Sequence, residues 1–116
     1  MQWTFGQFVP VVRAMTRALY DAGIRTHDVV AIELPNNWEF VALTLATWNL
    51  GAVICPIIPI FREHEVREIV FKTRSKVLVV LETFRHFAFT GMVHNLTREY
   101  PDLRIWMRGG QRIPIA

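Results

Sequence analysis

The 116-residue sequence is poor in cysteine, serine and lysine. Its one cysteine, Cys55, excludes an internal disulfide and suits a reducing compartment. Its one serine is Ser75, and only two of its 13 cationic residues are lysines. Hydrophobic residues make up 52% of the chain and charged residues 20%, a balance that excludes a disordered or fibrous protein. The composition therefore predicts a folded domain, which we expect in the cytoplasm.

The sequence also lacks an apolar run that is long and clean enough to cross a membrane. Its longest uncharged stretch, residues 40–61, is broken by Asn49, Gly51, Pro56 and Pro59. The first residues have neither the basic start nor the apolar run of a signal peptide. We therefore expect no transmembrane segment and no secretory leader.

The net charge of +3 is too small and too scattered to indicate a nucleic-acid-binding protein. The 13 cationic residues face 10 acidic ones, and many are direct neighbours, as in Arg62-Glu63 and Arg67-Glu68. A nucleic-acid-binding protein is expected to cluster its cations on one face. We expect no nucleic-acid partner.

Hydrophobic periodicity predicts four helices that alternate with four strands. The predicted helices span residues 5–22, 37–50, 63–73 and 87–99, and the predicted strands span residues 29–34, 52–55, 77–81 and 104–107. Three of the strands are continuous apolar runs, which is typical of strands covered on both faces. A helix between consecutive strands predicts parallel pairing. The predicted fold class is therefore α/β, a parallel sheet with helices on both faces, followed by an irregular tail over residues 109–116.

The first predicted helix has clear end signals and one misfit. Thr4 and Gln7 have the spacing of a capping box, and Gly23 is typical of the residue that ends a helix. Pro10 removes one hydrogen bond from the interior of this helix. It therefore predicts either a kink or a helix that begins near Val9.

The helix predicted over residues 37–50 is apolar around most of its circumference. Asn36 and Glu39 predict a capping box at its start, and no charged residue follows Glu39 within the helix. A helix that is apolar all round is buried all round. A chain of this size cannot easily cover both sides of it. We therefore expect the remainder of a larger domain, a complementary chain or a second copy to cover one side.

No nucleotide-binding loop is visible. The first predicted strand is followed by Pro35-Asn36-Asn37 instead of a glycine-rich turn, and neither the dinucleotide fingerprint nor the P-loop occurs anywhere. Gly109-Gly110 follows the last predicted strand but leads into Gln111-Arg112-Ile113-Pro114, which cannot open a regular helix. We interpret this glycine pair as a turn.

The remaining chemistry-bearing residues give no catalytic or metal site. Residue 68, four positions after His64, is a glutamate, so the two-histidine zinc spacing is absent. Cys55 has no visible base beside it, and Ser75 lies outside any nucleophile elbow. The charged stretch over residues 62–68 is typical of a solvated helix face. We expect surface or loop positions for the four histidines, which are His27, His64, His86 and His94.

Several short segments follow one another in a recognisable order. They are Thr4-Phe5-Gly6-Gln7-Phe8, Asp28-Val29-Val30-Ala31-Ile32, Leu34-Pro35-Asn36, Gly51-Ala52-Val53 and Lys76-Val77-Leu78-Val79-Val80. In this order they resemble the extreme N-terminal part of the acyl-adenylate-forming enzymes, which comprise acyl-CoA synthetases, adenylation domains and luciferases. The resemblance fades after Trp106, and Pro59-Ile60-Phe61-Arg62-Glu63 is most similar to ligases for medium-chain or alicyclic acids. It implies that residues 1–108 form an incomplete N-terminal α/β segment of an AMP-binding ligase domain.

The resemblance also implies what the complete enzyme would do. With ATP and Mg²⁺ it would activate a carboxylate as an acyl-adenylate, and it would then transfer the acyl group to coenzyme A. The family's ATP loop, its metal- and ribose-binding acids and its late catalytic lysine do not occur here. No catalytic, cofactor-binding or metal-binding residue therefore maps onto this sequence. We expect an N-terminal fragment of a fatty-acid or related acyl-CoA ligase that is inactive alone. The alternatives are a non-catalytic association module and a free-standing flavodoxin-like domain.

Overall fold

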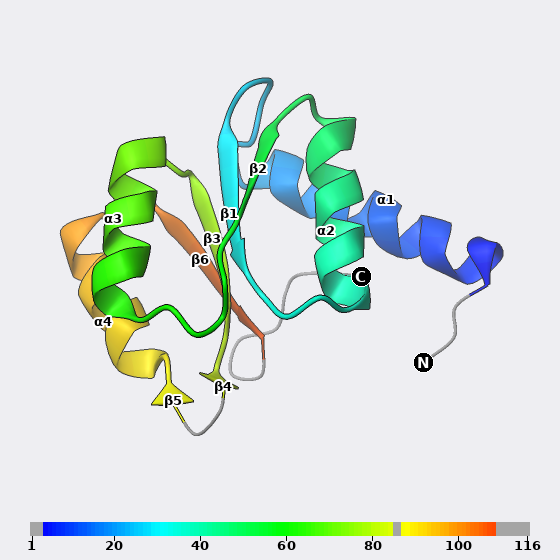
Figure 1. Cartoon of the computed structure of the whole chain (residues 1–116). Coiled ribbons are helices and arrows are strands. Elements are labelled where there is room, and N and C mark those ends of the chain that lie inside the picture. The colour runs from blue at the N-terminus through cyan, green and yellow to red at the C-terminus, as the bar shows by residue number, and fades with distance from the viewer. Residues whose placement is uncertain (1–3, 85–86, 109–116) are drawn as a thin grey trace.

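The computed structural model describes residues 4–84 and 87–108, which form a layered α/β fold (Figure 1). Its central sheet is parallel, with the order β2-β1-β3-β6. The strands of this sheet are β1 (Val29–Glu33), β2 (Val53–Pro56), β3 (Val77–Leu81) and β6 (Arg104–Arg108). The helices are α1 (Phe5–Asp21), α2 (Trp38–Asn49), α3 (Glu63–Thr73) and α4 (Thr90–Glu99). The predicted fold class and the parallel pairing of the first two strands are confirmed.

Two hydrophobic clusters, one on each face of the sheet, hold these layers together. Val30 and Ile32 of β1 pack with α1 and α2, whereas Ala31 between them packs with α3 and α4. This alternation follows from the strand geometry, in which successive side chains point to opposite faces. Both faces of β1 and β3 are therefore covered, as their apolar runs predict. Glu33 continues the alternation and lies on the α3–α4 face.

Strand β2 differs from the prediction because it forms an edge of the sheet. The side chain of Val53 is 47% exposed, and Cys55 is only half-buried. An edge strand has a neighbouring strand on one side only, so part of its surface stays uncovered. Ile54 packs against the cluster on the α1–α2 face and Cys55 against the cluster on the α3–α4 face, so β2 is covered on both faces only in part.

Helix α1 begins at the predicted capping box. The backbone N–H of Gln7 donates to the Thr4 hydroxyl, and the Thr4 N–H donates to the Gln7 side chain. The helix passes through Pro10 without ending, so the alternative of a start near Val9 is wrong. The hydrogen bond that Pro10 lacks would reach the carbonyl of Gly6. Both residues are exposed, so water can satisfy this carbonyl.

The C-terminus of α1 has the predicted glycine stop. Gly23 has a φ of +97° and donates its N–H to the Tyr20 carbonyl, while the Ile24 N–H donates to the Leu19 carbonyl. These two bonds form a Schellman motif, in which glycine adopts the left-handed conformation at little cost. The motif turns the chain toward β1.

Helix α2 begins one residue later than its predicted capping box requires. Its N-cap is Asn37, whose side-chain oxygen accepts the backbone N–H of Phe40 at 3.0 Å. Glu39 therefore occupies the second position of the helix instead of the third, where it would complete a box with Asn36. The prediction of Asn36 as the capping residue is wrong.

A two-stranded hairpin replaces the first residues of the helix predicted over 87–99. Phe87–Ala88 (β5) pairs antiparallel with Thr83–Phe84 (β4), and α4 begins only after it. The Arg62 guanidinium lies 4.1 Å from the centre of the Phe87 ring. These tertiary contacts favour the extended backbone over the helix that the apolar spacing predicts.

The ends of the chain are outside the described residues, and so are the predicted tail over 109–116, the pair Gly109-Gly110, and His86. Among the described residues, no helix combines the length and the apolar character needed to cross a bilayer.

Candidate functional site

The carboxyl end of the parallel sheet is where folds of this architecture usually bind nucleotides. In the described residues it has no glycine-rich loop, since β1 leads into Leu34-Pro35-Asn36. A phosphate at a helix N-terminus would use N–H groups that have no other partner. At α2 the Asn37 side chain already accepts the N–H of Phe40. This helix start is therefore capped by the chain itself.

Glu33 is the unusual ionisable group at this end of the sheet. Its side chain is 1% exposed, and neither carboxylate oxygen has a hydrogen-bond partner among the described residues. Burial raises the pKa of the Glu33 carboxyl to about 8, while Arg62 opposes this rise and Glu65 adds to it. The Arg62 guanidinium itself donates to the carbonyls of Pro59 and Ile60. At neutral pH Glu33 is therefore mainly protonated, which makes it a poor ligand for a cation.

The histidines that the structure describes do not come together. His27 lies in a turn and His64 and His94 lie on α3 and α4, and all three are exposed, as expected. No group of three or more histidine, cysteine or acidic side chains converges in the parts of the chain that are described.

Cys55 and Ser75 have surroundings that do not activate them. Burial raises the pKa of the Cys55 thiol, which keeps it in the less reactive protonated form. Ser75 is buried, and its hydroxyl lies 2.6 Å from the hydroxyl of Thr73, a neutral group that cannot act as a base. Ser75 lies between α3 and β3, where a turn was expected, and the inertness of the Cys55 thiol stays a prediction.

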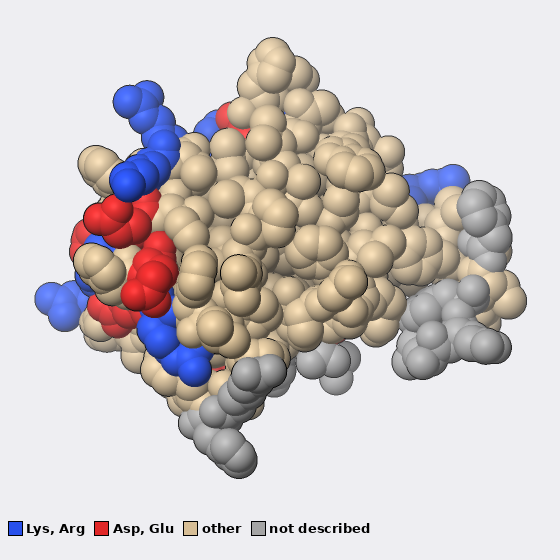
Figure 2. Space-filling view, in the orientation of Figure 1, with Lys and Arg blue, Asp and Glu red and all other residues tan. Residues whose placement is uncertain are grey.

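The charged stretch over residues 62–68 forms the start of α3, with two exposed and four half-buried polar residues. Arg67 contacts Glu63 at 2.6 Å within the helix and Glu99 of α4 at 3.1 Å. Charged side chains gather over α3 in Figure 2. Partly exposed ion pairs of this kind contribute little stability. The expectation of a solvated helix face holds for His64 and Glu68, which are exposed, whereas the other charged residues of the stretch are half-buried.

A large uncharged surface lies beside this charged region. Figure 2 shows no charged side chain over β2 and α2 in this view, in keeping with the uncharged stretch over residues 40–61. Helix α2, strand β2 and the segment after β2 carry exposed apolar side chains, among which Trp48 is 60% exposed. We call this surface the α2–β2 face and define it by Val41, Leu45, Trp48, Val53, Ile58 and Ile60. Within the described chain, α2 is therefore buried on one side only.

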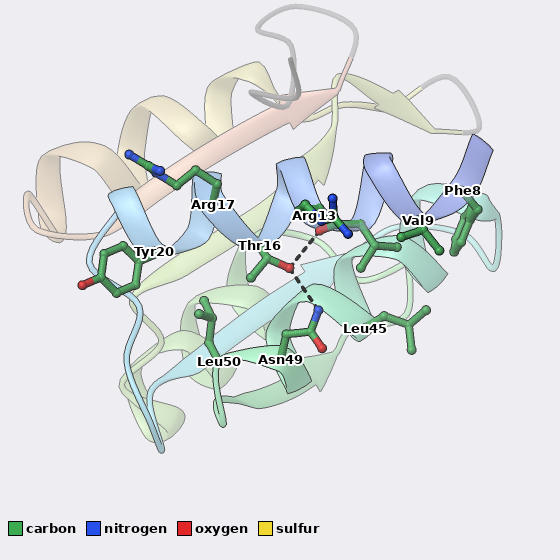
Figure 3. A pocket seen from close by; sticks show the side chains of 10 residues that line it. Phe8, Val9, Arg13, Thr16, Arg17, Tyr20, Leu45, Asn49 and Leu50 are labelled. Atoms are coloured by element: carbon green, nitrogen blue, oxygen red, sulfur yellow. Dashed lines mark hydrogen bonds between the residues drawn. The ribbon is translucent and has the colours of Figure 1, made fainter. Parts of the chain in front are cut away.

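A groove of about 670 Å³ runs between α1 and α2 (Figure 3). We call it the α1–α2 groove. Its apolar lining consists of Phe8, Val9, Val12, Tyr20, Leu45 and Leu50. Asn49 of α2 donates its side-chain amide to the Thr16 hydroxyl of α1 at 3.2 Å, which joins the two walls. The other polar lining residues are Arg13 and Arg17.

Sequence reasoning missed the burial of Glu33 and the α1–α2 groove. A signal for the first exists, because Glu33 is the one charged residue inside the apolar run over 29–34. The sequence contains no signal for the α1–α2 groove, because the groove is formed by residues that are distant in sequence.

Comparison with known proteins identifies the family. The profile of the family described as "AMP-binding enzyme" matches residues 1–108. The 2-hydroxy-7-methoxy-5-methyl-1-naphthoate–CoA ligase of Streptomyces carzinostaticus is 35% identical over 82 residues, which cover 71% of this chain and 15% of the ligase. The medium-chain fatty-acid–CoA ligase of Escherichia coli is 29% identical over 82 residues, which cover 71% of this chain and 14% of that enzyme. This chain therefore spans a small part of the relatives that it matches.

Solved structures show the same fold. The anthranilate CoA ligase AuaEII, crystallised with anthranoyl-AMP, superposes with a TM-score of 0.82 at 23% identity, over 96% of this chain and 21% of that chain. The acetoacetyl-CoA synthetase of Streptomyces lividans superposes with a TM-score of 0.79 at 27% identity, over 90% and 17% of the two chains. From the profile over residues 1–108 and the parallel sheet with two helices on each face, we conclude that this chain belongs to the AMP-binding enzyme family.

Proposed function

We propose that this chain supplies the first part of the ligase domain of an ATP-dependent acyl-CoA synthetase and does not activate a carboxylate by itself. The family match over residues 1–108 carries this proposal. The complete enzyme would activate a carboxylate with ATP as an acyl-adenylate and then form the thioester with coenzyme A.

The described residues do not fit ATP or Mg²⁺. Stabilising a transferring adenylyl group needs cationic and backbone donors around the phosphates, together with carboxylates that can hold the metal. Asn37 caps the α2 N-terminus, and Glu33 is buried and mainly protonated at neutral pH. We therefore assign no chemical step to this chain. Its role in the ligase is to form the sheet and the helices against which the rest of the domain packs.

We propose fatty or medium-chain carboxylates as the substrates of the complete enzyme, in the fatty-acid metabolism of the cytoplasm. The segment from Pro59 to Glu63 supports this class, and the name of the E. coli relative agrees with it. The single thiol, Cys55, suits a reducing compartment.

The α2–β2 face favours a second candidate function, a non-catalytic association module. Exposed apolar patches of this kind mark surfaces that bind partners. The partner would be the remainder of a ligase domain, a complementary chain or a second copy. The two candidates differ in whether the segment supports adenylation when the rest of a ligase domain is present.

ATP–pyrophosphate exchange tests the proposal for the isolated chain. The purified 116-residue protein is incubated with ATP, Mg²⁺ and each of a panel of fatty acids, and a complete acyl-CoA synthetase serves as the positive control. We expect exchange at background for every acid. Robust exchange that depends on an added acid would show that this chain has its own adenylation site.

A further inference from the structure

The α1–α2 groove has the shape and lining of a binding site for a helix. Both of its walls are α-helices, whose backbone N–H and C=O groups are satisfied within each helix away from the ends. A strand that adds to a sheet edge needs a continuous row of free backbone groups, and these walls do not present one. A third helix, by contrast, packs a row of its side chains into the groove between the two helices and needs no free backbone group. The groove geometry therefore favours a helix over a strand.

The rim of the groove is rich in arginine. Arg13 and Arg17 line it, and the Arg25 guanidinium lies 3.7 Å from the centre of the Tyr20 ring at one end. Asp21 pairs with Arg17 at 3.1 Å and leaves the rim with a net positive charge. An occupant with acidic residues beside its apolar face would complement this rim.

The apolar floor is continuous with the outer side of α2. Leu45 lines the groove and also belongs to the exposed stripe of Val41, Leu45 and Trp48, which recur at helical spacing. An amphipathic helix in the groove would therefore also cover part of the α2–β2 face. The matched relatives are several times longer than this chain, so a ligase domain has ample additional chain to supply it.

We propose that the α1–α2 groove receives an amphipathic helix with an acidic edge from the remainder of the ligase domain. This inference rests on the proposed function, in which the segment works inside such a domain. The inference specifies where the remainder of the ligase domain docks, that it docks through a helix, and that this helix carries acidic residues.

Site-specific cross-linking in an assembled ligase tests the inference. Residues 1–108 of this chain replace the matching segment of the S. carzinostaticus ligase, and the photoreactive residue benzoylphenylalanine replaces Leu45. The matched control places it at Phe71 of α3, which is 67% exposed on the opposite side of the sheet. We expect position 45 to cross-link to one helical peptide with acidic residues outside the grafted segment, and position 71 not to capture that peptide.

A charge reversal tests the rim. We expect Arg13→Glu to lower the yield of the cross-link from position 45 several-fold, because it places an acid opposite the acidic edge of the helix. Arg98→Glu reverses an exposed arginine on α4 and should leave the yield unchanged. Equal yields in both variants would contradict the acidic edge.

ATP–pyrophosphate exchange by the same chimera separates the two claims. If the chimera is active and position 45 cross-links to nothing, or only to a second copy, the groove assignment is overturned while the proposed function stands. A folded chimera without exchange activity counts against the proposed function itself.

Discussion

Replacing Glu33 with glutamine should make the stability of the chain much less dependent on pH. The carboxyl is buried without a hydrogen-bond partner among the described residues, and its pKa is raised from 4.5 to about 8. A raised pKa means that the folded chain holds the proton more tightly than the unfolded chain. The contribution of Glu33 to the free energy of unfolding is therefore most favourable below about pH 4.5, and it becomes less favourable as the pH rises toward 8.

The size of the effect follows from the two pKa values. Each pKa unit corresponds to about 1.4 kcal/mol, so the difference between 4.5 and about 8 corresponds to about 5 kcal/mol once the pH exceeds both values. At pH 7 the folded carboxyl is still mostly protonated, and the loss is about 3 kcal/mol. Glutamine has nearly the same shape and cannot ionise. The variant should therefore gain about 3 kcal/mol relative to the wild type between acid and neutral pH.

Urea denaturation followed by tryptophan fluorescence, repeated at several pH values between about 5 and 8, measures this difference. The wild-type curve should approach the Glu33→Gln curve in acid and fall below it toward neutral pH. Glu68→Gln, at an exposed position on α3, is the matched control and should follow the wild type. Parallel curves for wild type and Glu33→Gln would show that Glu33 is hydrated or paired in the folded chain and would refute the reasoning.

Further substitutions test the local structure and the exposed face. Asn37→Ala should lower the free energy of unfolding by about 1 kcal/mol in urea denaturation, because it removes the α2 cap, whereas Asn36→Ala should change it little. Gly51→Ala should also destabilise the chain by about 1 kcal/mol, because Gly51 has a φ of +69° and a Cβ there would lie 3.3 Å from the Thr26 hydroxyl. Trp48→Asp should leave the circular dichroism spectrum unchanged, because Trp48 is 60% exposed. We expect the wild-type chain to self-associate through its exposed apolar face, so the variant should lower the molar mass measured by light scattering toward that of the monomer. A strictly monomeric wild type would contradict the last expectation.

The fold was largely predictable because local and long-range signals agree. The strand over 77–81 and the helix over 63–73 lie at the predicted residues, since apolar runs and helical spacing coincide there with burial. The hairpin at Phe87–Ala88 was not predictable, because its backbone is set by pairing with Thr83–Phe84 and by the distant Arg62. The sequence alone also did not identify β2 as an edge strand, because strand order depends on the whole topology.

The candidate site was less predictable than the fold. The apolar character of α2 indicated an uncovered side, and the structure shows that side at Val41, Leu45 and Trp48. The α1–α2 groove could not be predicted from the sequence, because Thr16 and Asn49 meet there from two different helices. The burial of Glu33 and its raised pKa could not be predicted from the sequence either. A glutamate at the end of a strand is often solvated, and whether it is buried depends on the residues of α3 that pack over it.

Restoration of adenylation in a ligase that lacks its own first segment tests the central claim most directly. ATP–pyrophosphate exchange is measured for the S. carzinostaticus ligase without the matching segment, for the same ligase with residues 1–108 of this chain in its place, and for this chain alone. We predict exchange that depends on the parent's naphthoate substrate in the chimera, and background in the other two. Background exchange from a folded chimera, or acid-dependent exchange by this chain alone, would contradict the proposal that it is a structural part of an acyl-CoA ligase domain.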